Sequence, residues 1–380
     1  MLTKFLLAAA TASALSIPNN ASSSKGGSAK LLLGTPNTIS IADFDGTKFN
    51  IAAKKNFSGN PTWMVFNAGN LYAVDENSAT THLLKVDLAG NKIDEVSTTN
   101  GSNGVVHLEL TKDKSQMLGA AYGSAAIDVF DTKGGLKYVK SIKSEDKVGP
   151  NTARQDKPHP HQSVMDPSGR FFAVNDLGTD KILILDSQDG FKIVNHVPVQ
   201  PGGCGPRHGA FHPVGAEKAA HYVVLCEIKN LVVTYSLKYG GAKGIEFTEL
   251  QSISTFKSQA DMPATAAAGE LVVAPDNKNV YVSNRLTGGD TDNIAHFRVA
   301  GNDFKLEFVG LTSTGGKLPR MFSVSTDGKT LLVGNQDGKL GLVALKRNDD
   351  GSLVQAPVAS LEMSQFPGEK AGPSFVQQVA

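Results

Sequence analysis

Histidine, arginine and acidic residues stand at the ends of short apolar runs that repeat along this 380-residue chain. Imidazole and carboxylate groups can transfer protons, and guanidinium groups can bind an anion or stabilise a developing negative charge. If the fold gathers these groups at a concave mouth, they form a candidate site for acid–base chemistry on an anionic molecule. The main candidates are His161, Arg207, Arg320, Arg285, Asp176 and Glu227.

The apolar runs belong to a repeated unit of strand, tight turn and second strand. Residues 161–165 lead to 171–174 through the turn Asp166-Pro167-Ser168-Gly169, whose residue types suit a tight turn. The start of the first strand recurs at positions 62, 106, 161, 207, 269 and 320. That spacing is typical of four-stranded propeller blades.

The two ends of the chain supply one further blade. Residues 30–35 and 38–44 resemble a second and third strand without a first, and residues 372–376 resemble the missing first strand. A ring closed in this way leaves no open sheet edge. The sequence therefore predicts an all-β, seven-bladed β-propeller over residues 30–380, with the N- and C-terminal strands sharing one blade.

Propeller geometry places the candidate residues together. The first strand of a blade lines the central channel and the second strand returns, so the start of one and the end of the other lie on the same rim. His161, Arg207 and Arg320 start first strands, whereas Asp176 and Glu227 lie at or beside the ends of second strands. Purely structural roles remain open for all of these residues, with ion pairing the main alternative for Arg320 and Asp176, and also for Glu76.

Metal and cofactor sites are not expected. His159 and His161 could both face one ion, but no third ligand stands at a useful spacing. The balance of 37 basic and 36 acidic residues gives no electrostatic reason to expect nucleic acid as a partner.

The N-terminus has the pattern of a secretory signal peptide, which we assign to residues 1–18. Lys4 precedes an apolar run that is too short to span a bilayer and ends near a small-residue cleavage pattern. We expect a secreted protein, extracellular or in the cell wall, that does not insert into membranes and is a monomer. Three glycosylation sequons begin at Asn20, Asn56 and Asn100.

Two cysteines, Cys204 and Cys226, are 22 residues apart. An oxidising compartment permits a disulfide between them, but the sequence does not show that their backbones approach closely enough. A pair of buried free thiols is the alternative.

Two central motifs resemble the seven-bladed lactonase family, which includes 6-phosphogluconolactonases and 3-carboxy-cis,cis-muconate lactonizing enzymes. One runs from His161 through the Asp-Pro-Ser-Gly turn to residues 175–180, and the other is Gly205-Pro206-Arg207-His208 with residues 211–213. Ser283-Asn284-Arg285 also matches, and the likeness extends over residues 31–378. With its signal peptide, the chain is most similar to secreted, glycosylated carboxymuconate-cyclase-like proteins of fungi.

The resemblance assigns roles to individual residues. His161, Arg207 and Glu227 match the proposed catalytic histidine, arginine and glutamate, and Arg285 matches a substrate-binding arginine. Arg320 and Asp176 are further substrate-binding candidates from their position on the rim. For hydrolysis, His161 or Glu227 would activate water while Arg207 stabilises the oxyanion, without metal or cofactor.

Two functions follow from these observations. The first is an enzyme that acts on a small anionic lactone, or forms one from an unsaturated dicarboxylate. The second is a non-catalytic secreted or cell-surface glycoprotein, an adhesin or antigen, that uses the propeller as a binding platform. The combined presence of His161, Arg207 and Glu227 favours the enzyme, whereas export and glycosylation favour the platform.

Overall fold

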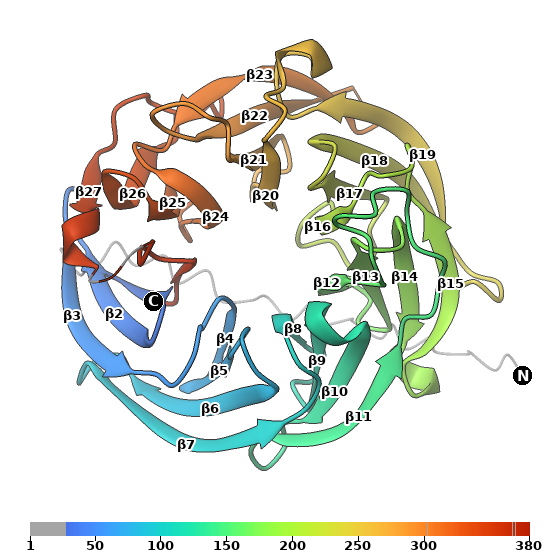
Figure 1. The fold of residues 1–380 in the computed structure, drawn as a ribbon, viewed down its shortest axis with the longest axis horizontal. Helices are drawn as coiled ribbons and strands as arrows, with labels where there is room; N and C mark the ends of the chain where they lie inside the picture. The colour runs from blue at the N-terminus through green and yellow to red at the C-terminus, as the bar shows by residue number, and fades with distance from the viewer. Residues whose placement is uncertain (1–27, 302, 367, 369) are drawn as a thin grey trace, which may run out of the picture.

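The computed structural model describes residues 28–301, 303–366, 368 and 370–380. In these residues, seven four-stranded antiparallel sheets surround a central axis, with one strand of each sheet nearest the centre of the ring (Figure 1). The prediction of an all-β, seven-bladed propeller is confirmed.

Six blades are each made of four consecutive strands. The first two are β4 (Met64–Asn67), β5 (Asn70–Val74), β6 (Thr80–Asp87) and β7 (Lys92–Asn100), then β8 (Val105–Leu110), β9 (Gln116–Ala121), β10 (Ala126–Asp131) and β11 (Lys137–Lys143). The next two are β12 (Pro160–Met165), β13 (Phe171–Asp176), β14 (Lys181–Asp186) and β15 (Lys192–Pro198), then β16 (Pro206–His212), β17 (His221–Cys226), β18 (Leu231–Tyr239) and β19 (Ile245–Ser254). The last two are β20 (Ala267–Val273), β21 (Asn279–Arg285), β22 (Asn293–Ala300) and β23 (Lys305–Ser313), then β24 (Lys317–Val324), β25 (Thr330–Asp337), β26 (Leu340–Lys346) and β27 (Ala359–Glu362). Short 3-10 helices are η1 (Tyr122–Ser124), η2 (Ser187–Asp189), η3 (Gln259–Asp261) and η4 (Met363–Gln365).

Both ends of the described chain build the seventh blade. It consists of β28 (Phe375–Gln378), β1 (Ala29–Thr35), β2 (Thr38–Phe44) and β3 (Phe49–Asn56), in that order from the centre outward. Leu33 of β1 lies opposite Val376 of β28. The predicted closure is therefore confirmed, although the C-terminal strand begins later than residue 372.

The core lies between neighbouring blades. Middle strands are apolar on both faces because each sheet packs between two others, as in β14, where residues 182–185 are all fully buried. Outer strands such as β7 are mostly exposed and contain more charged residues. This packing makes the ring a rigid frame for side chains at its inner edge.

Several predicted surface features have defined places in this frame. Asn56 and Asn100 are exposed at the ends of the outer strands β3 and β7, whereas Asn20 and the predicted signal peptide 1–18 lie outside the described residues. Cys204 and Cys226 form a disulfide, which settles the choice between a bond and free thiols. None of the helices in the described residues has the length and apolar character needed to span a membrane.

Candidate active site

Five of the six predicted site residues line one hollow of about 220 Å³ at a mouth of the central channel. His161, Arg207 and Arg320 come from the inner strands β12, β16 and β24. Glu227 directly follows β17, and Arg285 is the last residue of β21. The predicted convergence of first-strand starts and second-strand ends on one rim is confirmed for these residues.

Inner strands bulge where they supply residues to the channel. The pairing register shifts in β8, β12, β16, β20 and β24, close to positions 106, 161, 207, 269 and 320. A β-bulge adds an unpaired residue and re-aims its side chain. In β16 the bulge allows two consecutive residues, Arg207 and His208, to face the same part of the channel.

The Glu227 carboxylate lies among three guanidinium groups. Its Oε2 is 2.8 Å from Nε of Arg207, and its Oε1 is 2.5 Å from the nearest nitrogen of Arg154 and 3.3 Å from that of Arg285. Burial alone would raise the pKa of Glu227, but Arg285, Arg207 and Arg154 outweigh burial and lower the pKa to about 2. Glu227 is therefore ionised at neutral pH and is a weak base.

Arg207 is almost fully buried, with 2% of its side chain exposed. Burial and the nearby Arg285 lower its pKa to about 9, against the opposing effect of Glu227, so the guanidinium stays charged at neutral pH. Its NH1 group also donates a hydrogen bond of 2.5 Å to the carbonyl oxygen of Gly269. This cation is fixed in place and is available to a ligand in the hollow.

His161 is the buried imidazole of the site. Burial, together with Arg207 and His208, holds its pKa well below 6.5, so the ring is neutral at neutral pH. Its Nδ1 has no hydrogen-bond partner among the described residues. A neutral imidazole beside several fixed cations can accept a proton from water or substrate.

Arg320 forms an ion pair of 2.8 Å with Glu76, and both side chains line the hollow. This is the ion pairing that the sequence left open as an alternative for the two residues. Because both remain partly exposed, with 18% and 24% of their side chains accessible, the pair can still meet a ligand.

Asp176 is not part of this cluster, and its predicted substrate-binding role needs correction. The residue is fully buried, and its carboxylate accepts hydrogen bonds from Ser144 Oγ and from the backbone N–H groups of His159, Gly178 and Thr179. It ends β13 as expected, but its oxygens bind the connections at residues 144–159 and 177–179 and do not line the hollow. Asp176 therefore supports the backbone before His161.

Sequence reasoning missed Arg154, which comes from the long connection between β11 and β12. This side chain is 41% exposed, the highest value among the four arginines of the hollow. It lies outside the repeated unit, so no position in the repeat identifies it. Its contact with Glu227 depends on how residues 144–159 cross the rim.

A second layer lies deeper in the channel, beneath the hollow. His208 Nδ1 is 2.6 Å from Glu270 Oε1, and the ring of His208 is 5.1 Å from that of His161, measured between centroids. Burial raises the pKa of Glu270 to about 8, so this carboxyl group holds its proton at neutral pH. Trp63 packs against the same histidine. The floor of the site is thus polar in composition but close to neutral in charge.

The described residues contain no group of three or more histidine, cysteine or acidic side chains placed to hold a metal ion. The ring of His159 lies against Tyr122, and its two nitrogens are within hydrogen-bond distance of the Tyr122 carbonyl and Asp156. Its ring nitrogens are therefore already engaged by protein groups.

Comparison with known proteins identifies the family. The model of the seven-bladed β-propeller lactonases matches residues 26–365. A probable 6-phosphogluconolactonase of Arthroderma benhamiae is 30% identical over 87% of this chain and 85% of its own length, and 6-phosphogluconolactonase of Bacillus subtilis is 30% identical over 79% and 84%.

The fold is also similar to that of solved structures. The periplasmic gluconolactonase of Pseudomonas aeruginosa superposes with a TM-score of 0.77 at 23% identity, covering 93% of this chain and 99% of that one. With the family model, the relatives and the charged hollow in agreement, this chain belongs to the seven-bladed β-propeller lactonases and is an enzyme of that type.

Proposed function

We propose that the protein hydrolyses a small lactone that carries a phosphate or carboxylate group, with a 6-phosphogluconolactone-like molecule as the first candidate. The observation that carries this proposal is the placing of four guanidinium groups around the neutral imidazole of His161. Among the described residues, Glu227 and Glu76 are the acidic side chains that line the hollow. Formal charges in the hollow therefore favour an anion. The relatives named as 6-phosphogluconolactonases support the same substrate class.

In the proposed reaction, His161 accepts a proton from a water molecule as the water oxygen attacks the lactone carbonyl carbon. Arg207 stabilises the negative charge that develops on the carbonyl oxygen. The ring C–O bond then breaks, and the leaving alkoxide takes the proton back from His161. Glu227, with its low pKa, holds Arg207, Arg285 and Arg154 in place and is the weaker base of the two candidates.

The test is acid release from a panel of lactones, followed with a pH indicator after subtraction of spontaneous hydrolysis. The panel contains 6-phosphoglucono-δ-lactone, neutral glucono-δ-lactone and a carboxymuconolactone, and cis,cis-carboxymuconate tests the cycloisomerase direction. We expect the anionic lactones to give a kcat/KM at least about tenfold higher than the neutral one. Equal rates on neutral and anionic lactones, or no acceleration of any compound, would refute the proposal.

We further propose that the protein is secreted as a glycosylated monomer. Exposed sequons at Asn56 and Asn100 and the Cys204–Cys226 disulfide support an oxidising, secretory route. The native protein should lose mass on endoglycosidase treatment. The mass decrease should be smaller for the Asn56→Gln variant and for the Asn100→Gln variant, because each lacks one glycan. A native mass equal to that of the unmodified polypeptide would contradict the glycosylation.

A further inference from the structure

Two arginines of the hollow are preceded by the same backbone arrangement. In Gly205-Pro206-Arg207 and Leu318-Pro319-Arg320, the residue before proline has a left-handed backbone, with φ of 67° at Gly205 and 57° at Leu318. In both cases its N–H donates a 2.8 Å hydrogen bond to a buried aspartate, from Gly205 to Asp180 and from Leu318 to Asp292.

The two aspartates occupy equivalent positions in different blades. Thr179-Asp180 directly precedes β14 and Thr291-Asp292 directly precedes β22, so each lies in the turn between the second and third strands of its blade. Each reaches the next blade, where the corresponding arginine lies in the first half of the inner strand. Their exposed fractions are only 7% and 3%.

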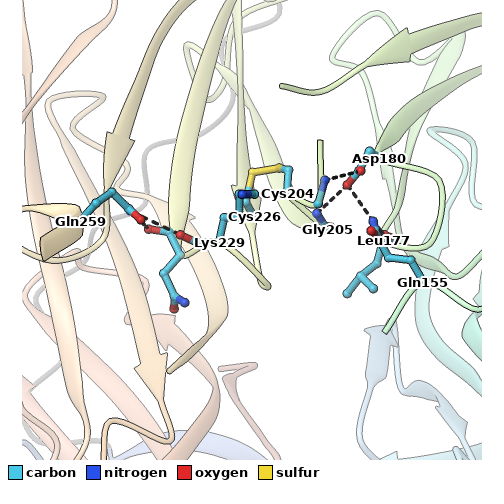
Figure 2. The surroundings of a disulfide bond; sticks show 10 residues. Gln155, Leu177, Asp180, Cys204, Gly205, Cys226, Lys229 and Gln259 are labelled. Carbon is cyan, nitrogen blue, oxygen red and sulfur yellow. Dashed lines mark hydrogen bonds between the residues drawn. A yellow bond between two sulfur atoms is a disulfide. The ribbon is translucent and has the colours of Figure 1, made fainter. Parts of the chain in front are cut away.

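Each aspartate also accepts hydrogen bonds from residues that directly follow a second arginine of the hollow in the sequence. Asp180 accepts a 2.8 Å hydrogen bond from the Gln155 side chain, next to Arg154, as Figure 2 shows together with the bond from Gly205. Asp292 accepts hydrogen bonds from the N–H groups of Leu286 and Thr287, directly after Arg285.

We propose that Asp180 and Asp292 are positioning residues that hold the four guanidinium groups of the hollow as two pairs. Asp180 fixes Arg154 relative to Arg207, and Asp292 fixes Arg285 relative to Arg320. The kinetic tests of this role rest on the proposed function, because they need a lactone that the enzyme hydrolyses. The physical reason for this role is that the like charges of the guanidinium groups repel one another, so the backbone must hold the groups together.

Backbone strain supports this role. Leu286 and Leu318 both have left-handed φ values, 58° and 57°, which branched and bulky residues rarely adopt. Both donate their N–H groups to the same oxygen of Asp292. Such backbone conformations persist where the surrounding contacts impose them. Hydrogen bonds from backbone N–H groups to a carboxylate are stronger than hydrogen bonds between two neutral groups.

The disulfide bond supports the backbone around Asp180, which holds the pair Arg154 and Arg207. Cys204, bonded to Cys226, lies between Gly203 and Gly205, which both donate N–H hydrogen bonds to Asp180. Figure 2 shows the disulfide beside this carboxylate. The Asp292 pair has no disulfide beside it in the described residues, so we expect the loss of Asp292 to displace its arginines further.

The experiment compares Asp292→Asn and Asp180→Asn with Asp290→Asn, an exposed control in the same loop as Asp292. Asp292→Asn should raise KM for the anionic lactone about tenfold and leave the KM for neutral glucono-δ-lactone within about twofold, because Arg285 and Arg320 bind the anionic group. Asp180→Asn should lower kcat about tenfold on both lactones, because Arg207 stabilises the oxyanion. The control should match the native enzyme.

Crystal structures of the variants provide a measurement that does not depend on activity. In Asp292→Asn we expect Arg320 to leave Glu76, and in Asp180→Asn we expect Arg154 to leave Glu227. If no lactone is hydrolysed but these displacements occur, the proposed function fails and the positioning role stands. Unmoved guanidinium groups in both variants, or equal losses of kcat and unchanged KM for every lactone in both, would overturn the positioning role.

Discussion

The substitution Glu227→Gln removes the negative charge at the centre of the arginine cluster while it keeps the shape of the side chain. In the native protein the pKa of Glu227 falls from 4.5 to about 2. That difference corresponds to about 3 kcal/mol of folding free energy at neutral pH. The loss of one partner of a buried ion pair costs a similar amount, about 3–5 kcal/mol. We therefore expect the variant to be less stable than the native protein by about 3 kcal/mol at pH 7.

The pH dependence of this difference has a defined sign. Because the folded-state pKa of Glu227 is lower than the unfolded value, its stabilising contribution is complete above pH 4.5 and is lost as the pH falls towards 2. Glutamine resembles the protonated side chain, so native protein and variant should converge in acid. The expected difference at pH 3 is about 1 kcal/mol.

The assay is urea unfolding at pH 7 and pH 3, followed by circular dichroism and by the fluorescence of Trp63, the single tryptophan of the chain. Glu246→Gln, an exposed glutamate on β19, is the matched control and should change stability by less than about 0.5 kcal/mol. Equal stabilities of native protein and Glu227→Gln at pH 7 would show that the arginines do not depend on this charge. A difference of the same size at both pH values would refute the electrostatic explanation.

Further predictions concern the reaction and the ring. His161→Ala and Arg207→Ala should each lower kcat at least about a hundredfold with an unchanged circular dichroism spectrum, typical of a general base and an oxyanion-stabilising group. Because burial and Arg207 lower the pKa of His161, the rate should stay constant from pH 8 down to values well below 6.5; an acid limb centred at or above 6.5 would contradict this. Reduction of Cys204–Cys226, 22 residues apart, should cost about 3 kcal/mol of unfolding free energy in urea titrations with and without reductant, and equal midpoints would exclude a stabilising bond. Deletion of residues 373–380 should expose the edge of β1, lower the melting temperature and increase light scattering, whereas an unchanged melt would argue against closure by β28.

The repeat made the fold and most of the site predictable from sequence. The start of the first strand recurs at a spacing of about 45–60 residues. This spacing predicts both the number of blades and the rim on which the residue at each strand start lies. This is why His161, Arg207 and Arg320 could be placed together although they are far apart in the chain. The strand ends placed Glu227 and Arg285 by the same reasoning.

The repeat did not predict the positions of some side chains, for reasons that the structure identifies. Asp176 ends a second strand, as Glu227 nearly does, but hydrogen bonds from loops draw its carboxylate inward. Arg154 belongs to the connection between β11 and β12, which lies outside the repeated pair of strands. His208 and Glu270 face the channel because the inner strands bulge beside them, and a bulge leaves no clear pattern in a single sequence.

The charges of the hollow also bear on product release. Lactone hydrolysis adds one carboxylate to the substrate, so the product carries one more negative charge than the lactone that entered. Four guanidinium groups would hold this product more tightly than the substrate if nothing opposed them. Glu227 and Glu76 neutralise part of that charge, and the neutral His161 adds none. In the proposed reaction the two carboxylates would serve turnover in two ways, since they would hold the arginines in place and would limit the attraction of the hollow for the acid that it forms.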